Sequence, residues 1–141
     1  MPAADVQVYL NRARDFLEGV RLLRSELSTY GCSSALLAIH GALSYCDALR
    51  IGLGEDKLSS DDHSKAPAAL KQLLTNRRYE KLEGIARLSR LLASKSDVAY
   101  GRESIQISKA KSLIEQSERF VVWAETLGKE LRIEGWSDDN F

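Results

Sequence analysis

The chain has 141 residues, of which 44% are hydrophobic and 28% charged, and its 20 basic and 20 acidic residues give a formal net charge of zero. This balance excludes a disordered chain and a whole-molecule attraction to nucleic acid, and the length suits one domain. The two cysteines, Cys32 and Cys46, form no CxxC pair, and no apolar run approaches the roughly 20 residues that span a bilayer. We therefore expect a cytoplasmic protein with no membrane segment, no metal site and no cofactor.

The first half of the chain predicts two long helices. Apolar residues recur at helical spacing from Asp5 to Ser28, with Asp5 suited to the N-cap and Gly31 to the left-handed residue that closes the helix. A second helix is predicted from Ser33 or Ser34 to Gly52, and a polar loop follows over Leu58–Asp62.

The second half predicts three further helices and a tail. The third helix starts from a cap at Asp61 or Asp62, has Pro67 in its first turn, and ends at a break at Thr75-Asn76. The fourth helix runs from about Tyr79 to about Ser94. After a break over Ser96–Glu103, the last helix runs from Ser104 to about Leu127. Residues 129–141 lose the periodicity, so this tail either frays or docks through Ile133, Trp136 and Phe141. With no period-two alternation, the pattern predicts an all-α, up-and-down bundle of four to five helices over residues 1–128.

Positive charge is concentrated in one stretch. Lys71–Lys95 holds seven basic and two acidic residues, a net charge of +5. Five of the basic residues fall on the predicted fourth helix: Arg77, Arg78, Lys81, Arg87 and Arg90. We interpret this run as a solvated face, because Tyr79 is the only aromatic residue in the stretch and nucleic-acid contacts need stacking or base-reading groups.

Three polar residues share one face of the predicted second helix. His40, Ser44 and Asp47 are spaced four and three residues apart, so their side chains lie along one line. Our first interpretation is a polar stripe inside a bundle, and the alternative is a site in which His40 carries a proton or contacts a ligand. A Ser-His-Asp hydrolase is disfavoured, because Ser44 in mid-helix lacks the exposed turn and the oxyanion donors of acyl transfer.

A second polar group surrounds the predicted turn before the last helix. It consists of Lys95, Asp97, Tyr100 and Arg102. Lys95 and Arg102 would suit a phosphate at a helix N-terminus, where free N–H groups and the helix dipole favour anions. The structural alternative is that Tyr100 packs into the bundle and its hydroxyl ties the turn.

Four segments, taken in order, resemble the small stand-alone HEPN proteins of prokaryotes. They are ARDFLEGVRLL (residues 13–23), SALLAIHGALSYCDALRIGL (34–53), DDHSKA (61–66) and KSDVAYG (95–101), and the resemblance covers residues 6–127. Membership of this family implies a helical bundle, a homodimer, and a helix-lined cleft that binds a nucleotide or cuts RNA beside a partner nucleotidyltransferase. On this chain the cleft would be lined by His40, Asp47, Lys95 and Tyr100.

The chain departs from the ribonuclease members of that family. Those members carry an Arg-x4-6-His motif, but the residues at the matching distance before His40 are Ala35, Ser34 and Ser33, and those before His63 are Leu58, Lys57 and Asp56. We therefore expect a non-catalytic or weakly catalytic module that binds a nucleotide, RNA or a partner protein as a homodimer. The alternatives are a ribonuclease toxin of a toxin–antitoxin pair, using His40 with Arg50 or Lys95, and a structural helical adaptor.

Overall fold

The structure is a computed structural model that describes residues 2–55, 58, 63–101 and 105–137. These residues form an all-α structure without a strand, which confirms the predicted class. The elements, in chain order, are α1 (Pro2–Leu23), the 3-10 turn η1 (Arg24–Glu26), α2 (Leu27–Gly52), the 3-10 turn η2 (His63–Lys65), α3 (Ala66–Asn76), α4 (Glu83–Tyr100) and α5 (Ile107–Glu130).

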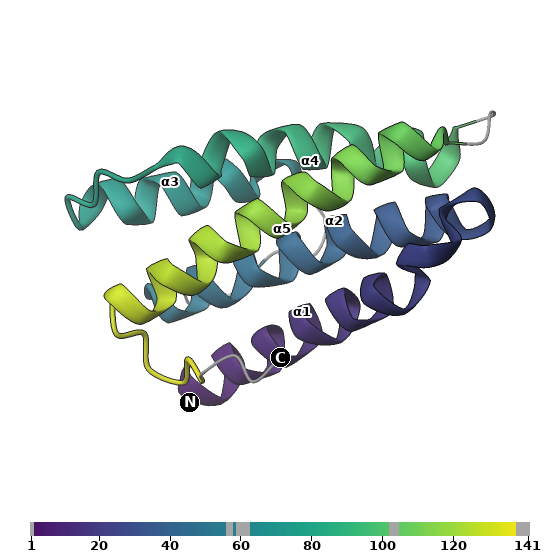
Figure 1. The fold of residues 1–141 in the computed structure, drawn as a ribbon. Coiled ribbons are helices and arrows are strands. Elements are labelled where there is room, and N and C mark those ends of the chain that lie inside the picture. Colours follow the sequence, from purple (N-terminus) through teal and green to yellow (C-terminus); the bar gives the residue numbers. More distant parts are fainter. Residues whose placement is uncertain (1, 56–57, 59–62, 102–104, 138–141) are drawn as a thin grey trace.

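The long helices lie side by side around α2. Figure 1 shows α1 and α4 running in one direction and α2 and α5 in the other, with α3 beside α4. Along the parts of the chain that are described, no helix has both the length and the apolar character needed to cross a membrane.

The first two helices meet earlier than the sequence predicts. α1 ends at Leu23, and the short turn η1 leads directly into α2 at Leu27. The expectation that Gly31 closes a helix is wrong: Gly31 is buried inside α2, close to Ile105 and Ala110. What the Tyr30-Gly31 pair marks is a kink, since Tyr30 has φ −115° and ψ 26° within an otherwise helical stretch.

The boundaries of the other helices agree only in part with those predicted from the sequence. α1 begins at Pro2, so Asp5 lies in its first turn rather than at its cap, where a carboxylate still complements the helix dipole. α2 ends at Gly52 and Pro67 lies in the first turn of α3, as predicted. The proposed caps Asp61 and Asp62 fall outside the described residues.

The predicted boundaries of the fourth and fifth helices are wrong. α4 begins at Glu83 rather than Tyr79 and continues through the predicted break at Ser96 to Tyr100. Its last turns are held against α2: Val98 is buried, and its carbonyl accepts a 3.0 Å hydrogen bond from the Cys32 thiol. This packing outweighs the polar sequence Lys95-Ser96-Asp97, and α5 then begins at Ile107 instead of Ser104.

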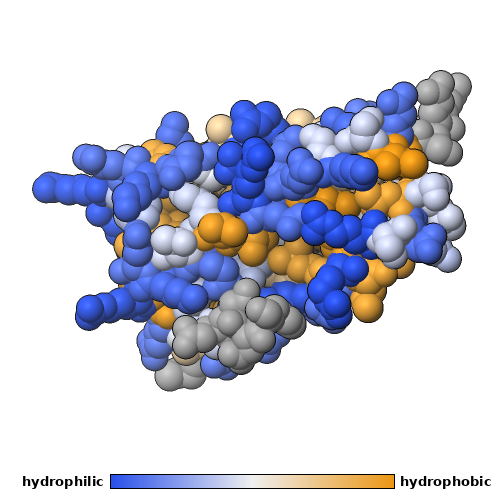
Figure 2. All heavy atoms as spheres, in the orientation of Figure 1, coloured by the Kyte–Doolittle hydropathy of each residue, from blue (hydrophilic) through white to orange (hydrophobic). Residues whose placement is uncertain are grey.

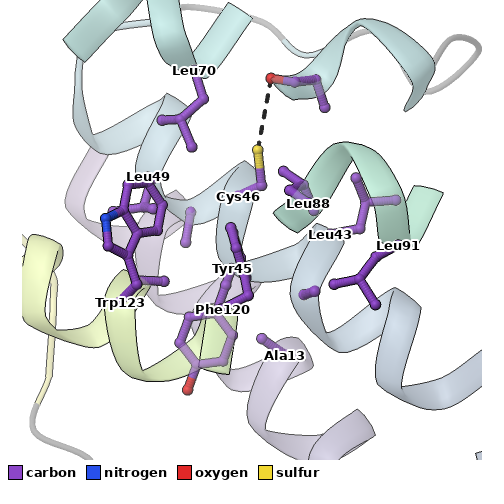
Figure 3. Packing of buried hydrophobic residues seen from close by; sticks show 14 of the residues in the cluster. Ala13, Leu43, Tyr45, Cys46, Leu49, Leu70, Leu88, Leu91, Phe120 and Trp123 are labelled. Carbon is purple, nitrogen blue, oxygen red and sulfur yellow. Dashed lines mark hydrogen bonds between the residues drawn. The ribbon is translucent and has the colours of Figure 1, made fainter. Parts of the chain in front are cut away.

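The core is built around α2, whose small residues let its neighbours approach. A Cβ on Gly41 would lie 2.9 Å from Cδ2 of Leu17, so α1 contacts the α2 backbone at this point. Figure 3 shows apolar side chains from the neighbouring helices gathered around α2, with the Cys46 thiol directed at the carbonyl of Ala66. Among the largest fully buried side chains are Leu10, Ile39, Tyr45, Leu49, Leu70, Leu88, Leu91, Leu113 and Phe120.

The first residues after α5 return along the body of the protein. Ile133 is buried against Gly52, and Trp136 is half-buried against Gly128. Ser137 accepts hydrogen bonds from Arg14 of α1, at 2.8 Å through its hydroxyl and at 2.9 Å through its carbonyl. Phe141, the third residue through which docking was predicted, lies outside the described residues.

Candidate functional site

His40 lies half-buried at the middle of α2. Its ring contacts Phe16 of α1, with 5.7 Å between the ring centroids and 38° between the planes. Burial lowers the pKa of His40, and the positive charges of Lys95 and His63 lower it further. The charges of two basic side chains from elements far from His40 in the sequence therefore act on its ring.

Lys95 and His63 are in direct contact. Nζ of Lys95, on α4, lies 3.4 Å from Nδ1 of His63, in the turn η2. Three elements, α2, η2 and α4, thus each supply one basic side chain to a single region. We call His40, His63 and Lys95 the basic triad. A cluster of this kind attracts anions, because every added positive charge raises the local potential.

A pocket opens beside the triad. It has a volume of about 250 Å³ and lies between the start of α3 and the middle of α4. Its lining combines apolar side chains with one imidazole and two hydroxyl groups: His63, Ser64, Pro67, Ser89, Leu92 and Ala93. Apolar side chains combined with a few polar groups are the usual lining of a small-molecule site.

Asp47 belongs to a separate charged cluster at the end of α2. Burial raises the pKa of Asp47 to about 6, although the positive charges of Arg50 and Arg12 act in the opposite direction. Arg50 lies 3.8 Å from Asp47 and forms two hydrogen bonds, of 2.6 and 2.8 Å, with Glu55. Different charges thus act on Asp47 and on His40, while Ser44 between them is buried at 6% exposure.

The structure does not form the turn expected around Lys95 and Tyr100. Lys95 and Asp97 lie on the continuous helix α4, where residues two apart point in different directions, and Asp97 is exposed. The last helix was predicted to begin at Ser104, but α5 begins at Ile107. Its N-terminus therefore lies further from Lys95 in the sequence than predicted. Arg102 and the side chain of Tyr100 lie outside the described residues, so their part in the predicted phosphate site stays a prediction.

The basic run of residues 77–90 does not form one helix face. Arg77, Arg78 and Lys81 precede α4, and only Arg87 and Arg90 lie on it. Arg78 has a positive φ of 59°, and Lys81 lies 3.7 Å from Glu130 of α5. The prediction that Arg77, Arg78 and Lys81 lie on the fourth helix is therefore wrong.

Sequence reasoning missed a buried polar network. Tyr45 donates a 2.6 Å hydrogen bond to Oε1 of Glu125, and Arg14 contacts the same oxygen at 2.8 Å. Trp136 donates to the other carboxylate oxygen at 3.0 Å. The only signal was an Arg and a Glu on the apolar faces of two predicted helices, and their pairing across the fold has no local signature. His63 was not among the residues predicted to form the site.

The described residues contain no group of three or more His, Cys, Asp or Glu side chains placed to hold a metal ion. Comparison with protein-family models found no match, and neither the curated proteins nor the solved structures include one that is significantly similar to the chain.

Proposed function

We propose that this chain is a HEPN-like bundle that binds the phosphate group of a nucleotide at the basic triad, and that it works as a homodimer without strong catalytic activity of its own. The observation that carries the proposal is the convergence of His40, His63 and Lys95 from three elements, next to the pocket. The triad would hold the phosphate, and Pro67 and Leu92 in the pocket would contact the base or sugar.

Electrostatics favours an anion at this place. His40 and Lys95 are both partly shielded from water, and His40 responds to the charges of Lys95 and His63. A bound phosphate would offset that repulsion with charge-assisted hydrogen bonds, which are stronger than neutral ones. Because the phosphate favours the protonated imidazole, its binding should raise the pKa of His40.

The proposal is tested by thermal unfolding with AMP, ADP, ATP and inorganic phosphate. A ligand that binds only the folded state raises the unfolding temperature with its concentration. We expect this shift for the wild type and its loss in Lys95→Ala, while Lys109→Ala, which removes an exposed lysine from α5, retains it. Equal curves with and without every ligand would contradict nucleotide binding and favour the adaptor.

Two further measurements separate binding from cleavage. NMR titration of the His40 ring should show a higher pKa when the best nucleotide is present. Incubation with RNA should leave the RNA intact; degradation that His40→Ala abolishes would instead establish the ribonuclease alternative. A partner nucleotidyltransferase remains part of the proposal and is tested by co-purification with the product of a neighbouring gene.

A further inference from the structure

The segment after α5 occupies a formed seat on the surface of the protein. We call residues 131–137 the tail, and the residues that receive it, Arg14, Tyr45, Gly52, Glu125 and Gly128, the seat. The indole of Trp136 lies 6.1 Å from the Tyr45 ring and donates to Glu125, while Arg14 donates to Ser137. The seat therefore contacts three groups of the tail: the indole ring and the indole N–H group of Trp136, and the carbonyl of Ser137.

Two glycines shape the seat to the tail. A Cβ on Gly52 would overlap Ile133, and a Cβ on Gly128 would overlap the indole of Trp136. The seat therefore fits this segment closely. Most of its contacts are made by residues distant from the tail in the sequence, so a tail from a second copy would find the same contacts.

The junction between α5 and the tail is short and strained. Arg132 follows the helix with a φ of 51°, a left-handed conformation that is unfavourable for a residue other than glycine. The N–H of Ile133 bonds to the carbonyl of Gly128 at 3.1 Å, which reverses the chain directly after α5. Short strained hinges favour exchange of a terminal segment between copies, because the open form relieves the strain.

The surface beside the seat carries both apolar and charged side chains. Where α1 and α5 lie near each other beyond the tail, a groove of about 340 Å³ has an apolar part, made by Leu17, Val20, Val121 and Val122, and a charged part, made by Arg21, Arg24 and Glu118. Leu22 on α1 and Val122 on α5 are 66% and 67% exposed. Figure 2 shows apolar side chains at the surface in this part of the molecule. Exchange of tails would hold the α1/α5 faces of two copies together and shield these side chains from water.

We infer that the tail is exchangeable, and that two copies of this chain associate by each docking residues 131–137 into the seat of the other. The partner is a second copy because its tail carries the indole, the N–H group and the carbonyl that the seat recognises. This inference names a contact for a homodimer and does not depend on nucleotide binding.

The test uses cysteine pairs in a Cys32→Ser, Cys46→Ala background. A Cβ on Gly52 lies 3.4 Å from Cβ of Ile133, close to the separation found in disulfides. Chains carrying Gly52→Cys with Ile133→Ala, which removes the overlap between a side chain at position 52 and Cγ2 of Ile133, are mixed with chains carrying Ile133→Cys alone under mild oxidation. We expect a covalent heterodimer on a non-reducing gel, because a bond between these positions requires the tail of one chain to lie in the seat of another.

The double variant, Gly52→Cys with Ile133→Cys, is the matched control. Oxidised when dilute, it should close within one chain and stay monomeric by sedimentation as the concentration rises. The wild type should form dimers with increasing concentration, and Arg132→Gly, which relieves the hinge, should form fewer. Closure of the double variant without any heterodimer in the mixture, or equal dimerisation of the locked and wild-type chains, would overturn the inference.

Discussion

The phenol of Tyr45 donates a 2.6 Å hydrogen bond to Oε1 of Glu125, which joins the middle of α2 to α5 across 80 positions of sequence. Burial raises the pKa of this phenol well above its ordinary value, and the hydrogen bond with Glu125 adds to the effect, so Tyr45 remains protonated and keeps donating at any physiological pH. Arg14 contacts the same oxygen, and the side chains of Arg14 and Glu125 are only 8% and 11% exposed. This buried pair fixes α1 relative to α5.

Replacing Arg14 with Met should destabilise the protein strongly. The change leaves the carboxylate of Glu125 buried without its cation, which typically costs about 3–5 kcal/mol. Urea unfolding followed by circular dichroism measures the loss. Arg21→Met is the matched control, because Arg21 pairs with Glu18 on an exposed part of the same helix, and its unfolding midpoint should hardly move. Equal effects of the two variants would contradict this assignment.

Replacing Asp47 with Asn should stabilise the protein in a pH-dependent way. Burial raises the pKa of Asp47 from 3.8 to about 6, so the folded chain holds a proton that the unfolded chain releases between these values. The free energy of unfolding therefore falls as the pH rises from about 4 to about 6. We subtract the free energy of unfolding of the wild type from that of Asp47→Asn. This difference should be about 1–3 kcal/mol larger at pH 7.5 than at pH 4.

Urea unfolding of both proteins at several pH values between 4 and 7.5 checks this expectation. Asp15→Asn, which removes an exposed carboxylate from α1, controls for the change in net charge. A constant difference between Asp47→Asn and the wild type across the range would show that Asp47 is not destabilised by its burial.

Two glycine substitutions inside helices should have opposite effects. A Cβ on Gly128 overlaps the Trp136 indole, so Gly128→Ala must displace the tail and should cost about 1–3 kcal/mol. A Cβ on Gly31 meets only ordinary contacts of 3.5 and 3.6 Å, so Gly31→Ala should stabilise the protein by about 0.5–1 kcal/mol through its helix propensity. Thermal unfolding measures both, and fluorescence quenching of Trp136 in a Trp123→Phe background reports whether the tail is released.

Arg78→Gly should stabilise the end of α3. Arg78 has a φ of 59°, and the chain reverses through a 3.0 Å bond from the N–H of Tyr79 to the carbonyl of Leu74. Glycine adopts this conformation without the penalty of a side chain, so we expect a gain of about 1 kcal/mol in the free energy of unfolding. Arg77→Gly, at a neighbouring residue with φ −94°, should give no gain. A loss of stability in Arg78→Gly would contradict the role assigned to its conformation.

Helical periodicity was enough to predict the all-α class and most of the helices. It failed at the boundaries, where tertiary contacts decide. Gly31 resembles a terminator, but it is buried inside α2, where a Cβ would make only ordinary contacts with Ile105 and Ala110. The polar residues before Val98 resemble a break, but the packing of Val98 on α2 keeps them helical.

The candidate site was predicted in part. His40 and Lys95 were both singled out; the charge of Lys95 acts on His40, and Lys95 contacts His63 of η2 instead of forming the expected turn. His63 was missed because a lone histidine near a helix start carries no sign of what it will face. The pairing of Arg14 with Glu125 was missed because the residues are 111 positions apart, and no local pattern specifies such a contact.

The central position of α2 has a consequence for how the protein unfolds. α1, α3, α4 and α5 all contact α2. Removing α2 from the structure would expose apolar faces of the other four helices at once, so no large part of the fold can persist without it. Amide protons of α2 should therefore exchange with solvent only through global opening, whereas those at the exposed edge of α3 exchange through local fluctuations.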